Sequence, residues 1–265
     1  MRGDDLPAAS PGSFRSTETP ASDLQIDVRL LDLTLDTPEE NLALDEALLL
    51  RARGRGGEIL RLWESPVPFV VLGVAGRLRD EVDVEAARRD GIPVLRRASG
   101  GGTVLQGPGC LDFALVLSLE DRPELRDVTR SYVHILETVA AAVAPGEILQ
   151  SGTSDLPRGA FKVSGNAQKR TRDMLVHHGT LLYDFDIDAM ARYLREPERQ
   201  PDYRRRRPHG EFVRNLPVAR ATIAARLALA WDAVESADTA EYLALPDVAR
   251  LVREKYADPA WTERF

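Results

Sequence analysis

The sequence predicts a mixed α/β fold, and three observations lead to that class. Short segments such as residues 26–33 alternate apolar with polar side chains, which is typical of strands. Longer segments such as residues 128–143 repeat apolar side chains every three or four positions, which is typical of amphipathic helices. The two patterns also follow one another along the chain, so we expect a sheet with helices packed on it.

Composition limits the class of protein further. Of the 265 residues, 43% are hydrophobic, which is enough for a sizeable core, and the net charge of −7 argues against a basic face for nucleic acid. The single cysteine cannot form an internal disulfide, and no apolar run reaches the ~18 residues of a membrane span. We therefore expect a soluble, cytoplasmic protein that binds neither nucleic acid nor membranes.

The N-terminal part predicts a tail followed by a strand and a helix. Residues 1–25 are rich in Pro, Ser, Thr and Asp, so we expect a flexible tail there and a single domain over residues 26–265. The apolar alternation that predicts the first strand starts at Ile26. Thr37 and Glu40 form a capping-box pattern, which predicts the start of a helix that ends near Gly54.

The later elements follow from the same two periods. Strands are predicted over residues 59–63, 69–72, 92–96, 111–119 and 174–183, and helices over residues 83–90, 128–143, 187–194, 219–234 and 248–256. Gly91 is expected to end the first of these helices. We expect the helical C-terminal third to pack on the sheet rather than to form an independent domain.

The strongest candidate for a ligand-binding segment is the glycine-rich loop, residues 96–104, with the sequence RRASGGGTV. Three successive glycines are costly in a folded chain, but their amides can approach an anion or a ligand carbonyl closely. Arg96 or Arg97 would add positive charge to such a site. The alternative, a flexible turn with incidental arginines, is less consistent with a position directly after a predicted strand.

Three further side chains are candidates for chemistry. Cys110 is the only thiol, and because no base lies near it in the sequence we interpret it as a packing residue rather than a nucleophile. Lys162 either faces solvent or places its charge in the same cleft as the glycine-rich loop, where it could stabilise a developing negative charge. Asp155 is a candidate ligand for Mg²⁺.

Two clusters of basic residues complete the candidates. His177 and His178 are adjacent on a predicted strand and must point to opposite faces, so we expect one in the core and one in the cleft, and no zinc site. The run YRRRR at residues 203–207 is interpreted as solvent-exposed. The alternative is a docking patch for an acidic partner or for phosphate.

Taken together, these motifs resemble the lipoate and octanoate branch of the biotin/lipoate protein ligase family. The resemblance covers roughly residues 41–216. Residues 41–47 (NLALDEA) are similar to the family's first-helix signature, and the glycine-rich loop is similar to its acyl-binding loop. Residues 162–168 (KVSGNAQ) are similar to the segment that carries its lysine, and residues 177–182 (HHGTLL) to the strand that follows.

The resemblance implies the mixed sheet flanked by helices that biotin ligases share with class II tRNA synthetases. It implies that ATP, with Mg²⁺, converts lipoate or octanoate to acyl-AMP, and that the acyl group passes to a lysine of a lipoyl-domain acceptor. Such acceptors are E2 subunits of 2-oxoacid dehydrogenases or the glycine cleavage H protein. Lys162 would be catalytic, Asp155 would bind the metal, and an apolar tunnel would hold the chain. The other site residues would line the acyl and adenylate pocket: Arg97, Ser99, Gly100, Gly101, Gly102, Thr103, Val104, Gly165, Ala167 and His178.

The chain departs from the family's patterns in three places. Many ligases carry His-Asp after the acyl-binding loop, where this chain has Leu105-Gln106-Gly107. Cysteine-dependent octanoyltransferases place their nucleophile shortly before the lysine motif, and residues 152–159 contain no cysteine, which favours ATP-dependent activation. ATP-independent transfer between carriers, and acyl or adenylate binding without catalysis, remain the alternatives. The chain after Leu216 is too short for a full accessory domain, so a separate accessory chain could complete the site.

Overall fold

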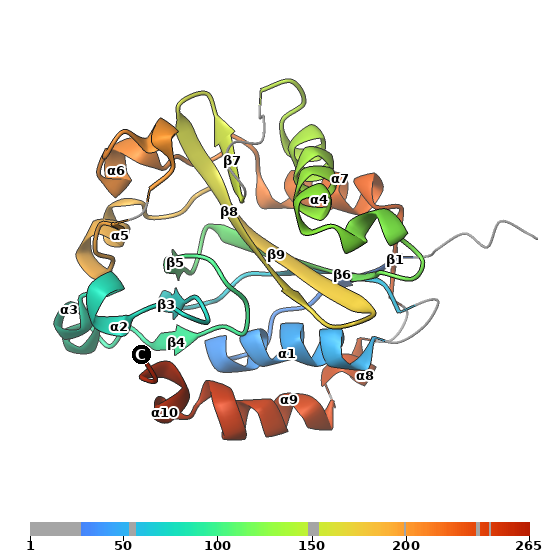
Figure 1. Ribbon diagram of the computed structural model, residues 1–265, viewed down its shortest axis with the longest axis horizontal. Helices are drawn as coiled ribbons and strands as arrows, with labels where there is room; N and C mark the ends of the chain where they lie inside the picture. The colour runs from blue at the N-terminus through green and yellow to red at the C-terminus, as the bar shows by residue number, and fades with distance from the viewer. Residues whose placement is uncertain (1–27, 53–56, 148–153, 199, 237–238, 244) are drawn as a thin grey trace, which may run out of the picture.

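The computed structural model describes residues 28–52, 57–147, 154–198, 200–236, 239–243 and 245–265 (Figure 1). The predicted tail over residues 1–25 and the predicted helix end at Gly54 lie outside these ranges. No helix in the described ranges is both long and apolar enough to cross a membrane.

Ten strands are described, and they form two sheets. The strands are β1 (Val28–Asp32), β2 (Ile59–Trp63), β3 (Phe69–Leu72), β4 (Val94–Arg96), β5 (Val104–Gln106), β6 (Cys110–Ser118), β7 (Asp155–Arg158), β8 (Phe161–Arg170), β9 (Met174–Leu182) and β10 (Ala233–Glu235). The large sheet has the order β10-β1-β2-β6-β9-β8-β7, and the small sheet has the order β4-β3-β5. Strands β10, β1 and β2 run parallel, whereas the rest of the large sheet is antiparallel.

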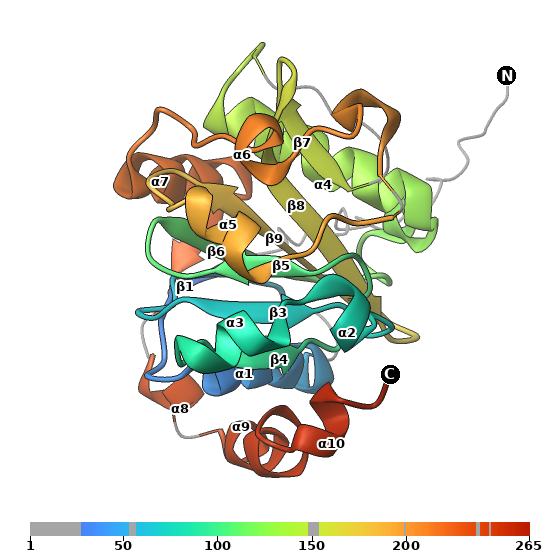
Figure 2. The ribbon, with the colours of Figure 1, turned by 90° about the vertical axis from the view of Figure 1, so that its left-hand side faces the viewer.

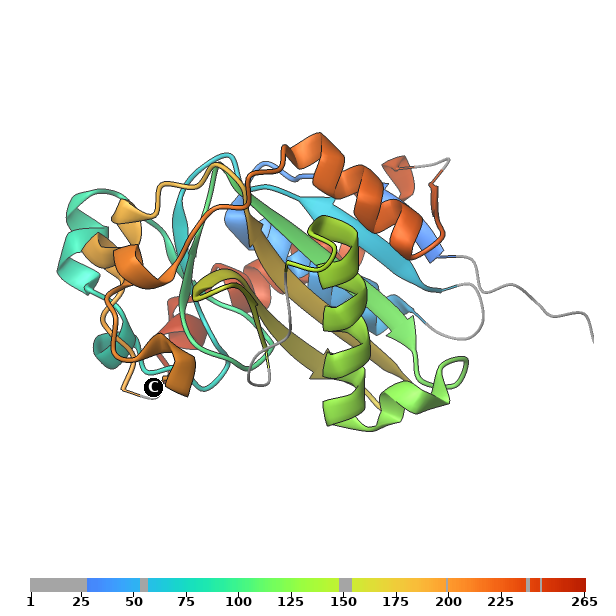
Figure 3. The same ribbon diagram turned by 90° about the horizontal axis from the view of Figure 1, so that it is seen from above.

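Helices cover both faces of the large sheet. They are α1 (Pro38–Arg51), α2 (Leu78–Glu81), α3 (Val84–Arg89), α4 (Val128–Val143), α5 (Asp188–Tyr193), α6 (His209–Phe212), α7 (Arg220–Ala230), α8 (Ala240–Leu243), α9 (Pro246–Leu251) and α10 (Pro259–Thr262). Two short 3-10 helices, η1 (Pro123–Arg126) and η2 (Asp202–Arg204), are also present, and the π-helix η3 (Val252–Tyr256) continues α9. Helices α4 and α7 lie together on one face, and α1 and α9 lie on the other (Figure 1, Figure 3). The small sheet lies beside the large one with α2, α3 and α5 around it (Figure 2). The predicted mixed α/β fold is confirmed.

Alternation along β6 shows how the two faces are built. Phe113 and Leu115 belong to the core beneath α4 and α7, whereas Ala114 and Val116 belong to the core beneath α1 and α9. Because successive side chains of a strand point to opposite faces, Asp112 lies on the same face as Ala114. This face, which we call the α1 face, carries the polar residues described below.

The predicted helix starts are confirmed by their caps. The amide of Glu40 donates to Thr37 Oγ1 at 3.3 Å, and the amide of Thr37 donates to Glu40 Oε2 at 3.0 Å, which completes the capping box at α1. Asp83 caps α3 through the amide of Ala86, and Gly91 follows that helix with a φ of +68°. Local side chains therefore fix where these helices begin and end.

The predicted helix over residues 219–234 is wrong at its C-terminal end. Helix α7 ends at Ala230, Asp232 adopts a φ of +48°, and β10 then pairs in parallel with β1. At the edge of the sheet, β1 has backbone groups that need hydrogen-bond partners, and β10 supplies them. This pairing outweighs the helical periodicity of residues 231–234. Strands β5, β7 and β8 were also not among the predicted strands, and β5 and β7 are only three and four residues long.

Candidate active site

A single cavity of about 590 Å³ brings the predicted motifs together. Its walls come from the glycine-rich loop between β4 and β5, from β6, β8 and β9 of the large sheet, and from the segment that carries α5 and α6. Most of the predicted site residues line it, namely Arg97, Gly101, Gly102, Thr103, Val104, Asp155, Lys162, Gly165, Ala167 and His178. Ser99 and Gly100 do not line this cavity and instead hold residues that do.

Strand register explains why these residues meet on the α1 face. Ala167 of β8 pairs with His178 of β9, and His178 pairs with Ala114 of β6. Thr180 lies two residues further along β9 and pairs with Asp112. Residues at these register positions share a face, so the sheet places them in two neighbouring rows beside the glycine-rich loop.

Arg97 supports the glycine-rich loop from inside. Its guanidinium donates through Nη2 to the carbonyl oxygens of Gly100 at 2.5 Å and Gly102 at 2.9 Å, and through Nε to Ser99 Oγ at 3.1 Å. Burial lowers the pKa of Arg97 to about 10, so the group is still charged at neutral pH. Arg97 therefore places a positive charge at the cavity wall, while most of its N–H groups donate to the loop and hold it in place.

Within the described ranges, the loop glycines leave backbone donors without a partner, and two of these glycines, Gly101 and Gly102, line the cavity. Gly101 has a φ of +85°, a conformation that favours glycine, and the loop's carbonyls turn toward Arg97. Among the described residues, none accepts a hydrogen bond from the amides of Gly100, Gly101 or Gly102. Free amides of this kind form an anion-binding surface.

Arg96 does not contribute to the cavity, so of the two arginines proposed for the ligand only Arg97 is placed to act on one. The Arg96 side chain is buried and points away from the site. It donates to carbonyl oxygens of the segment after β3 and of the C-terminal helix, namely those of Gly73, Val74, Gly76, Trp261 and Thr262. Arg96 thus fastens the C-terminal segment beside the loop.

Lys162 faces the cavity, which decides between the two orientations left open by the sequence. Its Nζ lies 2.8 Å from Asp155 Oδ1, and the second oxygen of Asp155 accepts a hydrogen bond from the Tyr203 hydroxyl at 2.8 Å. Gly165 makes room for the ammonium, because a Cβ at that position would lie 3.1 Å from Lys162 Nζ. The cation is held at one place on the wall by a single carboxylate.

The same contacts bear on Asp155 as a metal ligand. Within the described ranges, no group of three or more His, Cys, Asp or Glu side chains is placed to hold a metal ion. Mg²⁺ bound with nucleotide commonly needs only one or two protein carboxylates. Lys162 and Tyr203 already use one lone pair on each oxygen of Asp155, and a bound Mg²⁺ would have to share the carboxylate with them, so the contribution of Asp155 to Mg²⁺ binding stays a prediction.

The two adjacent histidines occupy different environments, as expected. His177 lies in the core, where it stacks on Phe113 and its Nδ1 lies 3.0 Å from Gln168 Nε2. His178 lines the cavity, and its Nε2 lies 2.5 Å from Ser99 Oγ. Burial, and after it the charge of Arg97, lowers the pKa of His178 to about 3, so its imidazole is neutral at physiological pH.

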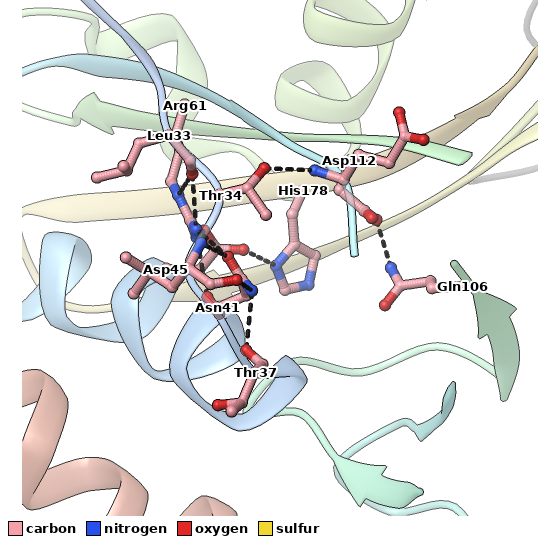
Figure 4. Close-up of polar contacts among 11 residues, drawn as sticks. Leu33, Thr34, Thr37, Asn41, Asp45, Arg61, Gln106, Asp112 and His178 are labelled. Carbon is pink, nitrogen blue, oxygen red and sulfur yellow. Dashed lines mark hydrogen bonds and ion pairs between the residues drawn. The ribbon is translucent and has the colours of Figure 1, made fainter. Parts of the chain in front are cut away.

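A buried ion pair supports this region from α1. Arg61 is fully buried and donates to Asp45 Oδ1 at 2.6 Å and to Asn41 Oδ1 at 2.6 Å (Figure 4). The other oxygen of Asp45 lies 4.0 Å from His178 Nδ1. The motif NLALDEA thus places Asn41 and Asp45 one helical turn apart on the side of α1 that faces the sheet.

Two polar residues of the cavity were not predicted from the sequence. Gln106 at the end of β5 donates through Nε2 to Asp112 Oδ1, and both side chains are buried and line the cavity. The expected apolar tunnel is therefore interrupted by a polar pair, although Trp63, Leu105 and Leu182 also line it. The unusual Leu105-Gln106-Gly107 sequence was the signal that could have indicated this site.

Two other expectations can be compared with the structure. Cys110 is fully buried at the start of β6, does not line the cavity, and has its pKa raised well above the usual range by burial, which confirms it as a packing residue. The solvent-exposed interpretation of the basic run is wrong for Arg204, which is buried, pairs with Glu196 and stacks on Phe212. Arg205 and Arg206, which follow it, are exposed to solvent as expected.

Comparison with known sequences extends these observations. The family described as "Lipoyl protein ligase A/B catalytic domain" matches residues 37–223. A protein assigned as a lipoate-protein ligase A in Aeropyrum pernix is 32% identical over 167 residues, which are 62% of this chain and 60% of that protein. The octanoyltransferase LipM of Carboxydothermus hydrogenoformans is 31% identical over 186 residues, which are 63% of this chain and 69% of that protein. The chain thus spans about three fifths of the first relative's length.

Comparison with solved structures gives the same fold. A structure from a study of a bipartite lipoate protein ligase and its E2 lipoyl domain from Thermoplasma acidophilum superposes with a TM-score of 0.76 at 23% identity, covering 90% of this chain and 96% of that one. A lipoate-protein ligase A bound with ATP superposes with a TM-score of 0.73 at 23% identity, covering 89% and 98%. Because the family match covers most of the described chain, this protein belongs to the lipoyl protein ligase A/B catalytic domain family.

Proposed function

We propose that this chain is a lipoate-protein ligase, which activates lipoate or octanoate with ATP and transfers the acyl group to a lysine of a lipoyl-domain protein. One observation carries the proposal. Lys162 presents its ammonium to the cavity, whereas Cys110, the only thiol of the chain, is buried away from it. Transfer through a cysteine thioester therefore lacks its nucleophile, and activation by ATP needs none.

The cavity supplies the charges that such an activation requires. In the reaction, a carboxylate oxygen attacks the α-phosphorus of ATP, the bond to the β-phosphate breaks, and pyrophosphate leaves with the bond's electrons. Negative charge grows on phosphoryl oxygens, and Lys162 and the free amides of the glycine-rich loop are fixed donors for it. Arg97 adds a positive charge behind the loop.

The second half of the reaction needs an acceptor amine. The neutral amine of an acceptor lysine attacks the acyl carbonyl, the bond to AMP breaks with its electrons leaving on AMP, and the proton lost by the amine passes to solvent. His178 is neutral and therefore does not repel the lysine side chain of the acceptor. Its ring is held by Ser99 and lies in the cavity wall between the glycine-rich loop and β9. We propose His178 as a residue that lies against the adenylate.

Partners follow from the relatives by analogy. The Thermoplasma structure belongs to a study of a bipartite ligase and its E2 lipoyl domain. We therefore propose an E2 lipoyl domain or a glycine cleavage H protein as the acceptor, and a separate accessory chain as a second partner. Titration of the purified chain with each acceptor, followed by mass measurement, would identify which one gains an acyl group.

Exchange between labelled pyrophosphate and ATP tests the activity. We expect exchange that depends on lipoate or octanoate and on Mg²⁺, and that is lost in Lys162→Ala. Lys169→Ala is the matched control, because Lys169 lies on the same strand but pairs with Glu46 outside the cavity. Acyl transfer from an octanoylated carrier without ATP would instead establish the transferase that the LipM relative suggests. Binding without exchange or transfer would establish a non-catalytic binder.

A further inference from the structure

The polar pair Gln106 and Asp112 is buried without being satisfied. Asp112 is 3% exposed and Gln106 is 7% exposed. Their mutual hydrogen bond uses Gln106 Nε2 and Asp112 Oδ1, and Asp112 Oδ2 and Gln106 Oε1 have no hydrogen-bond partner among the described residues. A buried polar atom without a partner costs about 1–3 kcal/mol, so such atoms call for a physical explanation.

Neighbouring polar groups leave the pair without a partner. Trp63 Nε1, which lines the same cavity, is itself buried without a hydrogen-bond partner among the described residues, and the neighbouring charged groups are occupied. Arg61 and Asp45 on the same face bind one another. The nearby carboxylate of Glu64 accepts hydrogen bonds from the amide of Gly109 and from the Tyr183 hydroxyl. Asp112 and Gln106, in contrast, hydrogen-bond to each other (Figure 4), line the cavity, and each keep one oxygen without a partner among the described residues. A ligand in the cavity is therefore the available partner.

Strand register places the pair away from Lys162. Asp112 on β6 pairs with Thr180 on β9, and Thr180 Oγ1 accepts from the amide of Gly165 on β8 at 3.3 Å. Gly165 lies beside the Lys162 ammonium. Two strand spacings, about 10 Å, thus separate the activation end of the cavity from Asp112. Trp63 and Leu182, which pair with residues at the start of β6, supply apolar surface at the Asp112 end.

The free valences of the pair define the chemistry of that ligand. Burial and the nearby carboxylates of Asp45 and Glu64 raise the pKa of Asp112 well above its usual range, against the smaller opposing effect of Arg61. The unpartnered oxygen of Asp112 accepts a hydrogen bond when the carboxyl is ionised and donates one when it is protonated, whereas Gln106 Oε1 only accepts. A group that both accepts and donates would satisfy both atoms.

We propose that Asp112 and Gln106 form a polar subsite that selects carboxylic acids carrying a hydroxyl or carboxamide at the end remote from the carboxylate. This inference rests on the proposed function, because it assumes that the acid's carboxylate lies near Lys162. An acyl chain without such a group would enter the cavity but would leave the two atoms unsatisfied. The subsite therefore favours such acids over octanoate without excluding octanoate from the cavity.

Two acids that differ at one heavy atom test the subsite. Calorimetric titration of the full chain with 8-hydroxyoctanoate and with nonanoate, in which a methyl replaces the hydroxyl, should show about tenfold tighter binding of the hydroxy acid, the effect of one or two net hydrogen bonds. Gln106→Leu should reduce this ratio, and the double variant Asp112→Leu with Gln106→Leu should reverse it. Cys110→Ala, on the same strand but outside the cavity, should keep it.

The outcomes separate the subsite from the activity. Equal binding of the two acids, or a ratio unchanged in Gln106→Leu, overturns the subsite and leaves the ligase proposal intact, since exchange with either acid can still occur. Failure of both acids to bind, with or without ATP, overturns the acyl site itself and the subsite with it. Should the double variant not fold, Gln106→Leu alone decides, because it keeps the buried carboxyl and changes only the acceptor.

Discussion

Two regions of the α1 face bury polar side chains to a similar depth but satisfy them differently. Around Arg61, the guanidinium donates both to Asp45 Oδ1 and to Asn41 Oδ1 at 2.6 Å, so its buried charge is paired without any ligand. Around Asp112, two buried oxygens have no partner among the described residues. The first region is therefore a support that fixes α1 against the sheet, and the second is a surface prepared for something that enters the cavity.

The largest effect on stability is expected from a substitution in the region around Arg61. Arg61→Met leaves Asp45 buried without its counterion, which should lower the free energy of unfolding by about 3–5 kcal/mol in urea denaturation. Adding Asp45→Leu should recover most of this loss. By contrast, the double variant Asp112→Leu with Gln106→Leu should change stability by less than about 1 kcal/mol, because it removes two unsatisfied atoms. Equal losses in the two regions would refute the distinction.

Substitution of Lys162 tests whether the cavity that contains Asp112 is the site of catalysis. Lys162→Ala should reduce pyrophosphate exchange by about 10²–10³-fold, the usual effect of removing one charged or oxyanion-stabilising donor. Its thermal unfolding should change little, because the side chain is partly exposed. Asp155→Asn should keep the ammonium in place and lose less activity. If Lys162→Ala retained full exchange, the ammonium would serve only to pair with Asp155.

The glycine-rich loop offers a matched pair of substitutions. Gly101→Ala should destabilise the protein by about 1–2 kcal/mol, because a side chain at a φ of +85° is strained and its Cβ would lie 2.9 Å from Arg97 Nη2. Gly102→Ala meets nothing within 4 Å and should unfold like the parent protein. Urea denaturation of both variants measures the difference. Similar losses would show that Arg97 does not hold the loop rigidly.

The core histidine gives an effect that appears only when the pH is changed. Burial lowers the pKa of His177 to about 3, so between pH 6.5 and pH 3 the unfolded chain binds a proton there that the folded chain does not. This histidine should therefore make stability rise with pH by about 1.4 kcal/mol per unit in that window. Subtracting the urea-denaturation profile of His177→Gln from that of the parent isolates the contribution. A flat difference between pH 4 and pH 6 would contradict it.

Much of the site was predictable because its signals are local. Capping by Thr37 and Asp83, the alternation that separates His177 from His178, and the position of the glycine-rich loop after a strand depend on neighbouring residues alone. The different fates of Arg96 and Arg97 were not predictable. Arg96 is buried by contacts with Trp261 and Thr262, far away in the sequence, and no local pattern records them.

The sequence by itself determined the mixed α/β class, the family motifs and the absence of a cysteine from the expected nucleophile segment, because these depend on residue type, period and spacing. Only the tertiary structure decided that Lys162 faces the cavity, that residues 233–235 leave the helix to pair with β1, and that Asp112 and Gln106 meet with two oxygens unsatisfied. These outcomes depend on strand register and on contacts between residues distant in sequence. Burial and pairing are properties of such contacts, and they do not exist until the chain has folded.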